Sequence, residues 1–595
     1  MKRKVIALLL TGIMATSMLT ACGGGKSDGG SADSGSSDGG STAGATELTP
    51  EEQEAVEAGI IQLDGTLPII KDPEAFEEKY GKITMLLVNS PDRVVEPAEL
   101  EACKQWEEAT GVSFDWQKIP LDGAQEKINL LLAGGDDLPD VFWNFGDGKS
   151  GNITVQYANQ EVFLPTEQLV ADYMPNLKAF LDENPQYQME ITAPDGHTYG
   201  FPYVEEMYGL VLTPGPFVIN KTWLDKVGKD VPTTVDEWVD CLKAFRDGGD
   251  LNGNGVDDEI PMATWFGATD TFGSYNLFYR FTGAFGCADS YCGGNQYADH
   301  LRIVDGKVTF TAMDEAFGKT AEFFNMLYNE GLIWNGSFEA DESASFKQSL
   351  IKEDVARIGS FGVWGDQEIT NLDVHDEYVA VPRLEGEAGK TGFAVNYSQL
   401  QDSSNTAITT TCKFPHVVAR FVDYLVSDPV ISVTGNWGPY NYAEDENGII
   451  RTPLDEDGNY VGANPDYTNF GDARVNSTPC RGSFIVKDEY YEKYCGYAYD
   501  AVQLLEMQRE NGKEDILAEY ETIPRVQMTQ EELQRLAQIQ PPVSDIVDRY
   551  INTWVTTGFS QESWDAYISE LEGAGVNDIV SIYQTAYDRA NAAIE

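Results

Sequence analysis

Short apolar runs alternate with helical segments near the start of the folded region, and this alternation strongly limits the folds open to the chain. Residues 83–88 are a continuous apolar run, which predicts a buried strand. Further strands are predicted at 112–119 and up to Trp143, separated by helices at about 97–110 and 124–132. Strands separated by helices pair in parallel, and such sheets bind ligands at the carboxyl ends of their strands. We therefore expect an α/β fold with a ligand site at that edge.

The first 21 residues have the form of a secretory signal peptide. Three cations at positions 2–4 precede an apolar run over 5–19, which is shorter than the roughly 20 residues that a membrane span needs. The stretch 19–22, Leu-Thr-Ala-Cys, resembles the lipobox of bacterial lipoproteins. That resemblance implies cleavage after residue 21 and a lipid on Cys22. An ordinary signal peptide with a chance cysteine is the alternative.

Residues 23–46 consist almost wholly of Gly, Ser, Asp, Ala and Thr. Such a segment has too little apolar surface to offset the entropy lost on ordering. We expect residues 22–47 to be a lipidated cysteine and a flexible tether, with a root-mean-square reach of about 25–30 Å. The predicted location is therefore extracytoplasmic, with a globular body held by a lipid at the outer face of the bacterial cell membrane.

Charge and cysteine usage exclude several classes of partner. The formal net charge is −57, which repels phosphate backbones and anionic head groups, so we expect no nucleic-acid partner and membrane attachment through the lipid alone. Setting Cys22 aside, seven scattered cysteines remain without a metal-type pair, and the four histidines form no zinc motif. The disulfide state stays open. About 550 residues beyond the tether suffice for two or three lobes.

Several segments, taken in order, are similar to those of one protein family. Residues 133–141 resemble the "small-Gly-Asp-x-Pro-Asp-Val" turn of extracellular solute-binding proteins that serve carbohydrate importers. Residues 195–202 resemble that family's "DGKxYGxP" segment, and 217–224 its "lwiNKdWL" strand. Residues 232–238 resemble its "PTTxdEf" helix start, and 415–426 its "NPexaarllDyl" helix. The chain is thus identified as similar to solute-binding protein family 1, in the large lipoprotein type of carbohydrate ABC importers.

Residues 250–261 form the sharpest motif. Asp250, Asn252 and Asn254 stand at loop positions one, three and five, and Gly255 stands at position six, as in an EF-hand. Position twelve is Pro261 rather than the bidentate glutamate, which departs from an EF-hand. The loop resembles the calcium loop of alginate-oligosaccharide-binding lipoproteins. That resemblance implies a structural calcium; its ligands would be Asp250, Asn252, Asn254, the carbonyl of Val256, Asp258 and Glu259. An acidic loop without metal is the alternative.

The resemblance also implies a fold and its division. We expect a two-lobed periplasmic-binding-protein-like type II fold with interleaved lobes and a helical C-terminal part. The N-terminal lobe would comprise residues 80–214 and about 393–430. The C-terminal lobe would comprise residues 215–392 and about 431–595, including the calcium loop and a helical tail. Ligand would lie between the lobes, which close by a hinge motion.

A sugar site needs flat aromatic surfaces beside fixed polar groups, because sugars present C–H faces and hydroxyl rims. Residues of these types in predicted loops or at strand ends are the candidates, although core packing is an alternative for each of them. The candidates are Trp143, Asn144, Trp265, Trp364, Trp437, Tyr440, Asn89, Asp92 and Tyr203.

By resemblance, the leading function is a monomeric, membrane-anchored binding protein that captures an oligosaccharide and delivers it to the permease subunits of an ABC importer, with no catalysis. The alternatives are a tethered glycoside hydrolase, a surface glycan adhesin, or a binder of peptides or another small solute. Because the chain has 97 acidic residues, paired carboxylates arise unavoidably and do not favour the hydrolase.

Overall fold

The computed structural model describes residues 47–592 with internal gaps. The gaps are 136, 147–148, 159, 268–274, 291–298, 340–342, 351–354, 364–368, 371–373, 393–396, 439–442, 445–449, 452–469, 489–503, 505–506 and 508–521. The predicted signal peptide, Cys22 and nearly all of the predicted tether lie outside the described residues. Within the described part of the chain, no helix combines the length and apolar character that crossing a membrane requires.

A six-stranded sheet organises the first lobe, in the order β14-β4-β11-β3-β1-β2. Strand β1 pairs in parallel with β2 and β3, as predicted, and β4 pairs in parallel with β14. Strand β11 runs antiparallel between β3 and β4. The carboxyl ends of β1, β3 and β4 therefore lie at one edge. The bounds are β1 Ile83–Asn89, β2 Phe114–Pro120, β3 Val141–Trp143, β4 Phe201–Glu205, β11 Leu400–Ile408 and β14 Ile485–Val486.

Both faces of this sheet are covered, which explains why the sequence of β1 is a continuous apolar run. Successive side chains of a strand point to opposite faces. Accordingly, Met85 and Leu87 join one core cluster, whereas Leu86 joins another with Ile128 of α4. The helices of this region are α1 Pro50–Glu57, α2 Pro73–Tyr80, α3 Glu101–Thr110, α4 Ala124–Gly134, α5 Ser150–Ala158, α6 Glu167–Tyr173, α7 Pro175–Glu183, α8 Pro185–Ile191, α14 Pro415–Leu425, α15 Pro429–Trp437 and α16 Phe470–Ser477.

A four-stranded sheet, in the order β10-β5-β9-β6, organises the second lobe. Strands β6 and β9 are parallel, and β5 is antiparallel to β9 and β10. The strands are β5 Phe217–Asn220, β6 Ile260–Ala263, β9 Ile358–Gly362 and β10 Tyr378–Ala380, with a separate hairpin of β7 Leu301–Val304 and β8 Lys307–Phe310. A further two-stranded pair is β12 Ala443–Glu444 with β13 Ile450–Arg451.

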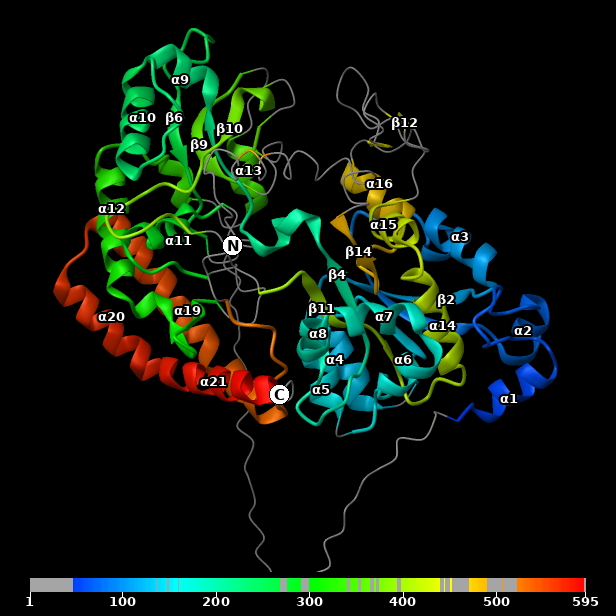
Figure 1. Cartoon of the computed structure of the whole chain (residues 1–595). Helices are drawn as coiled ribbons and strands as arrows, with labels where there is room; N and C mark the ends of the chain where they lie inside the picture. Colours follow the sequence, from blue (N-terminus) through cyan, green and yellow to red (C-terminus); the bar gives the residue numbers. More distant parts are fainter. Residues whose placement is uncertain are drawn as a thin grey trace, which may run out of the picture. The chain divides into compact units, whose positions relative to one another are not determined.

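The largest core cluster joins this second sheet to the C-terminal helices. Figure 1 shows the red helices α20 and α21 beside the green elements. The helices of this region are α9 Lys221–Val227, α10 Val235–Asp247, α11 Leu277–Phe281, α12 Glu315–Asn329, α13 Ser343–Leu350, α19 Gln530–Thr557, α20 Gln561–Ala574 and α21 Val576–Ala592. The fold is thus the expected two-lobed, interleaved α/β type with a helical C-terminal part, because the chain visits the first sheet, then the second, then the first again.

One predicted division needs correction. We expected the chain from about residue 431 onward to belong to the C-terminal lobe. Instead, β14 pairs with β4 of the first sheet, and Val433 of α15 joins the first lobe's core with Phe484. Long-range pairing of a two-residue strand overrides the expected division. Among the described residues after β14, those from Leu504 onward, including α19 to α21, contribute to the second core.

Candidate functional site

The carboxyl edge of the first sheet carries several of the predicted ligand residues. Asn89 ends β1, Trp143 ends β3 and is followed by Asn144, and Tyr203 lies near the end of β4. Because these three strands point the same way, their ends lie at one edge, which is where parallel sheets hold ligands. Trp437 reaches the same region as the last residue of α15.

Trp437 is fixed by a buried carboxylate. Its Nε1 donates to Oε1 of Glu205 at 2.6 Å, and the Asn436 side-chain amide donates to the same oxygen at 3.2 Å. The Tyr203 hydroxyl donates to the other oxygen of Glu205. Burial raises the pKa of Glu205, while the Arg474 charge and the bonds from Tyr203 and Trp437 oppose that rise. Burial and the Glu205 charge raise the pKa of Tyr203 well above its usual value.

Arg474 covers the indole of Trp437. Its guanidinium carbon lies 3.9 Å from the centre of the ring system, within cation–π range. Its Nε and Nη2 donate to the carbonyl and side-chain oxygens of Asn436, both at 2.8 Å. The indole therefore has one face against a cation and its N–H against an anion, which holds it in a single orientation.

The segment that follows Arg474 connects this cluster to the end of β1. The Arg93 guanidinium donates from Nε to the Val475 carbonyl at 2.8 Å and from Nη1 to Oδ1 of Asn89 at 3.3 Å. The Asn476 amide donates to the Asp92 carbonyl at 3.1 Å. Residues 474–476 contact two of the predicted ligand residues directly, Trp437 through Arg474 and Asp92 through Asn476. Asn89 is linked to the same segment through Arg93, and Tyr203 through Asn436. Asp92 takes part here through its backbone, and its side chain is exposed.

The predicted ligand role of Trp143 and Trp265 is wrong, because the structure buries both residues at 0% exposure. The Trp143 Nε1 donates to the Cys480 carbonyl at 3.3 Å, and the ring packs beneath Gly482, where an added Cβ would lie 2.1 Å from it. Trp265 lies just after β6, but its ring stacks on Phe346 inside the second core, with centroids 6.3 Å apart. Both rings follow strand ends yet serve packing.

Asn144 stays available to a ligand as a half-buried residue at the end of β3. Its φ is 44°, and its backbone N–H donates to the Asn405 carbonyl at 2.8 Å. The remaining two predicted ligand residues, Trp364 and Tyr440, lie outside the described residues.

Sequence reasoning missed Glu205, Asn436 and Arg474. An acid among 97 acids carries no distinguishing signal, and Arg474 reaches Trp437 only through the folded arrangement of α15 and α16. Within the cluster, amide, hydroxyl, guanidinium and indole groups are held by mutual hydrogen bonds. Tyr203 and Trp437 are themselves only 5% and 6% exposed, so a small part of each side chain is left for a ligand. Fixed polar groups beside an aromatic ring suit recognition of a ligand with many hydroxyl groups.

The predicted calcium loop connects α10 to β6. Backbone N–H groups of Gly253 and Gly255 donate to the two carboxylate oxygens of Asp250, at 2.7 and 2.9 Å. Gly255 has φ 85°, a conformation that glycine adopts without strain. Glu259 closes the loop by accepting the Leu251 and Asn252 N–H groups at 2.5 and 2.9 Å.

The remaining oxygen-bearing side chains of this loop face one another. The Asn254 amide donates to Oδ1 of Asp258 at 3.0 Å, and the Asn252 amide approaches the same atom at 3.4 Å. Among the described residues, no group of three or more His, Cys, Asp or Glu side chains forms a metal cluster. The predicted donors in this loop are instead a mixture of carboxylates, amides and one carbonyl. All of them are hard oxygen donors, which fits calcium.

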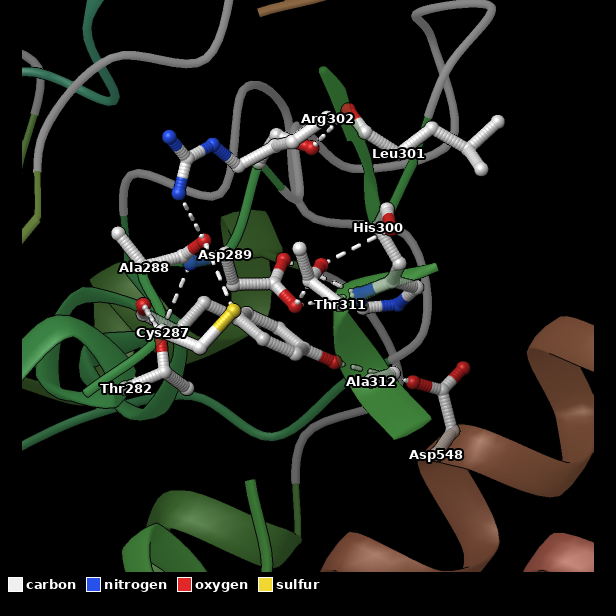
Figure 2. Close-up of polar contacts among 12 residues, drawn as sticks. Thr282, Cys287, Ala288, Asp289, His300, Leu301, Arg302, Thr311, Ala312 and Asp548 are labelled. Atoms are coloured by element: carbon white, nitrogen blue, oxygen red, sulfur yellow. Dashed lines mark hydrogen bonds and ion pairs between the residues drawn. The ribbon is translucent and has the colours of Figure 1, made fainter. Parts of the chain in front are cut away.

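A second group of titratable side chains lies in the second lobe (Figure 2). His300 is 4% exposed, and its Nδ1 lies 2.9 and 3.0 Å from the carboxylate oxygens of Asp289, which also accepts the Thr311 hydroxyl at 3.0 Å. Burial lowers the pKa of His300, but the charge and hydrogen bond of Asp289 together with the charges of Asp299 and Asp548 outweigh it, and the pKa is raised. Burial and nearby acids raise the pKa of Cys287 to about 12, so its sulfur stays a thiol. This group is part of the packed interior rather than a ligand site.

Comparison with known proteins finds one family and close relatives. The model for "Bacterial extracellular solute-binding protein" matches residues 93–430. The fructooligosaccharide ABC transporter substrate-binding protein FusA of Streptococcus pneumoniae serotype 4 is 32% identical over 515 residues, covering 86% of this chain and 90% of the relative. The solved structure of S. pneumoniae FusA with kestose has a TM-score of 0.68 at 30% identity, covering 86% of this chain and all of that one. An EF-hand mutant of FusA with fructo-nystose has a TM-score of 0.67 at 29% identity, with the same coverage.

Proposed function

Because the chain belongs to the bacterial extracellular solute-binding proteins, we propose that it captures an oligosaccharide outside the cell and delivers it to an ABC importer. The similarity to a fructooligosaccharide-binding relative over nearly its whole length carries this proposal. The Trp437–Glu205 cluster supports it, because an oriented indole beside amide and hydroxyl groups is suited to a sugar ring. The chain acts by binding and release, without breaking the sugar.

In this proposal Trp437, Tyr203, Asn89 and Asn144 contribute to the ligand surface, with Arg474 and Glu205 holding Trp437. Asp92, Trp364 and Tyr440 are further members proposed from the sequence. The protein is a monomer, held at the cell surface by a lipid on Cys22, and permease subunits of the importer are its partners. Mass spectrometry of the protein extracted from membranes tests the lipid: a diacylglycerol mass on Cys22 is expected, and an unmodified N-terminus would contradict it.

Calcium is proposed as a structural ion of the loop between α10 and β6. Asp250, Asn252, Asn254, the Val256 carbonyl, Asp258 and Glu259 would hold it. A bound divalent cation supplies charge that draws these oxygen atoms together and fixes the loop. The similarity to S. pneumoniae FusA, of which an EF-hand mutant has been solved, supports this assignment, as does the all-oxygen donor set.

A ligand panel tests the function. Purified protein is mixed with kestose, longer fructooligosaccharides, and unrelated plant and host oligosaccharides, and the thermal midpoint is measured, followed by calorimetry on each hit. We expect saturable binding of at least one oligosaccharide, with the sugar recovered intact by chromatography. Cleaved products would favour the hydrolase, whereas binding to insoluble polysaccharide without binding to short sugars would favour the adhesin.

A further inference from the structure

Two segments that connect the lobes meet at one buried carboxylate. Glu190 of α8 is 0% exposed. Its Oε2 accepts the Ser398 hydroxyl at 2.6 Å, and its Oε1 accepts the Arg525 backbone N–H at 3.0 Å. Ser398 lies just before β11 of the first sheet, and Arg525 lies on the extended segment that leads into α19. The Glu190 side chain therefore forms a hydrogen bond with each of these two segments.

The extended segment before α19 has two different faces. Val526 and Met528 belong to the second lobe's core. The intervening side chains point the other way, because successive residues of an extended chain alternate. Arg525 donates from Nη1 to the Gln401 carbonyl at 2.5 Å, and the Gln527 amide donates to the Glu190 carbonyl at 2.8 Å and to the Ser403 hydroxyl at 3.1 Å. The segment is thus apolar toward the second core and hydrogen-bonded toward the first sheet.

The surroundings of this contact are loosely filled. A cavity of about 330 Å³ adjoins it, with Gln188 and Met189 of α8 on one side and Ala586 and Ala590 of α21 on the other. Helices that are not packed tightly against each other can change their angle without breaking a dense interface. The hydrogen bonds of Glu190, Arg525 and Gln527 therefore add to the packing of Leu533 of α19 against the first lobe in joining the two sides.

Loss of a hydrogen-bond donor from the buried Glu190 carboxylate is energetically unfavourable. Removing one donor leaves a buried, unsatisfied acceptor, which costs more than the loss of an exposed bond. Burial raises the pKa of Glu190, and the bonds from Ser398 and Arg525 oppose that rise. Motions that separate the two segments from Glu190 are therefore disfavoured, whereas rotation about it preserves both bonds.

The geometry points to Glu190 as the positioning residue of the hinge, which restricts the lobes to rotation about one fixed point. This inference rests on the proposed function in one respect, because it assumes that solute capture requires the lobes to close. The hinge residue proposed here, Glu190, is not one of the residues proposed to contact the ligand. Its role is to set how widely the lobes sample different angles before a solute arrives.

The distribution of distances between the lobes tests this inference without any ligand. Fluorophores are attached through unnatural amino acids at Leu130 on α4 and Val304 on β7, which are 67% and 42% exposed. Single-molecule energy transfer then measures the width of the distribution. We expect Glu190→Ala to broaden it about twofold. Glu190→Gln should stay close to wild type, because its amide oxygen can accept from Arg525 while its NH₂ group donates to the Ser398 oxygen.

Asp423 provides a matched control. It is a buried carboxylate that accepts N–H bonds from Asn176 and Leu177 within the first lobe, at 2.9 and 3.1 Å. Asp423→Ala should lower the melting temperature without broadening the distribution. Equal broadening in both alanine variants, or wild-type width in a folded Glu190→Ala, would overturn the inference. If Glu190→Ala does not fold, Ser398→Ala takes its place with a smaller expected broadening, and wild-type width there would overturn it as well.

A kestose titration of the same labelled proteins separates the two proposals. Broadening in Glu190→Ala without any response to kestose or the rest of the panel would count against oligosaccharide capture and leave the hinge assignment standing. Closure of the wild type on adding sugar, with no broadening in the variant, would retain oligosaccharide capture and reject the role of Glu190.

Discussion

The indole N–H of Trp437 donates to the buried carboxylate of Glu205 across 2.6 Å, although the two residues are 232 positions apart in the chain. This bond links α15 to the carboxyl end of β4 and orients an aromatic ring at the edge where a parallel sheet holds ligands. A hydrogen bond to a charged group contributes about 1.5–3 kcal/mol. The pair therefore affects both the stability of the first lobe and the geometry of the proposed ligand surface.

Trp437→Phe should weaken oligosaccharide binding about 10-fold or more, because the ring loses the bond that orients it. Calorimetry with the sugar identified by the panel measures this. Trp238→Phe is the matched control: Trp238 is 0% exposed in the second core, and its Nε1 donates to the Ser360 hydroxyl at 3.1 Å. The control should lose stability and keep its affinity. An unchanged affinity in Trp437→Phe would remove Trp437 from the ligand surface.

Metal removal should lower thermal stability if the loop at 250–259 binds calcium. A native-state ligand at 100 times its dissociation constant adds about 2.7 kcal/mol to the free energy of unfolding. We expect excess chelator to lower the melting temperature of the wild type, calcium to restore it, and Asp250→Asn to abolish both responses.

Asp247→Asn is the control for the calcium experiment, because Asp247 is an exposed acid close to the loop that pairs with Arg246 at 2.8 Å. This variant should respond to chelator like the wild type. Identical melting temperatures of the wild type with calcium and with chelator would reject a stabilising calcium ion.

Sequence patterns predicted β1, β2 and β3 of the first sheet, most clearly β1, because burial on both faces leaves a continuous apolar run, as at Met85 and Leu87. They could not predict β14, since two residues carry no periodicity and their strand exists only through pairing with β4. Sequence patterns were limited in the same way at the candidate ligand site. Trp143 and Trp437 are both the last residues of elements that end at the proposed ligand edge, and only the fold shows that the Trp143 ring is covered by Gly482.

The junction of the N-terminal helix with the first lobe should depend on one buried hydrogen-bonded pair. Glu52 and His416 are both 0% exposed, with Oε2 of Glu52 2.6 Å from the imidazole Nδ1, and the His416 backbone N–H donates to Oε1 at 2.9 Å. Removing Glu52 leaves the buried His416 donors without their partner, which costs about 1–3 kcal/mol. Glu52→Ala should therefore lower the free energy of unfolding by about that amount in denaturant titration.

Glu51→Ala is the control for that experiment, since Glu51 meets Lys413 in a surface pair at 3.4 Å and such pairs contribute about 0–1 kcal/mol. A loss in Glu52→Ala no larger than in Glu51→Ala would contradict the importance of the buried pair.

The charge on Asp548 should make stability decline as the pH rises. Burial raises the pKa of this α19 carboxyl to about 6, with the His300 charge opposing the rise and Asp299 adding to it, and the Tyr279 hydroxyl lies 3.5 Å from its Oδ1. A folded-state pKa above the unfolded value favours the native state below about pH 4 and loses that contribution as the pH passes 6. His300, whose pKa is also raised, changes stability in the same direction. Asp548→Asn should therefore flatten the decline in unfolding free energy between pH 4 and 7, measured by urea titration, whereas Glu531→Gln at an exposed position of the same helix should leave it unchanged. Parallel pH profiles for the wild type and Asp548→Asn would show that this carboxyl ionises no differently in the folded and unfolded chains.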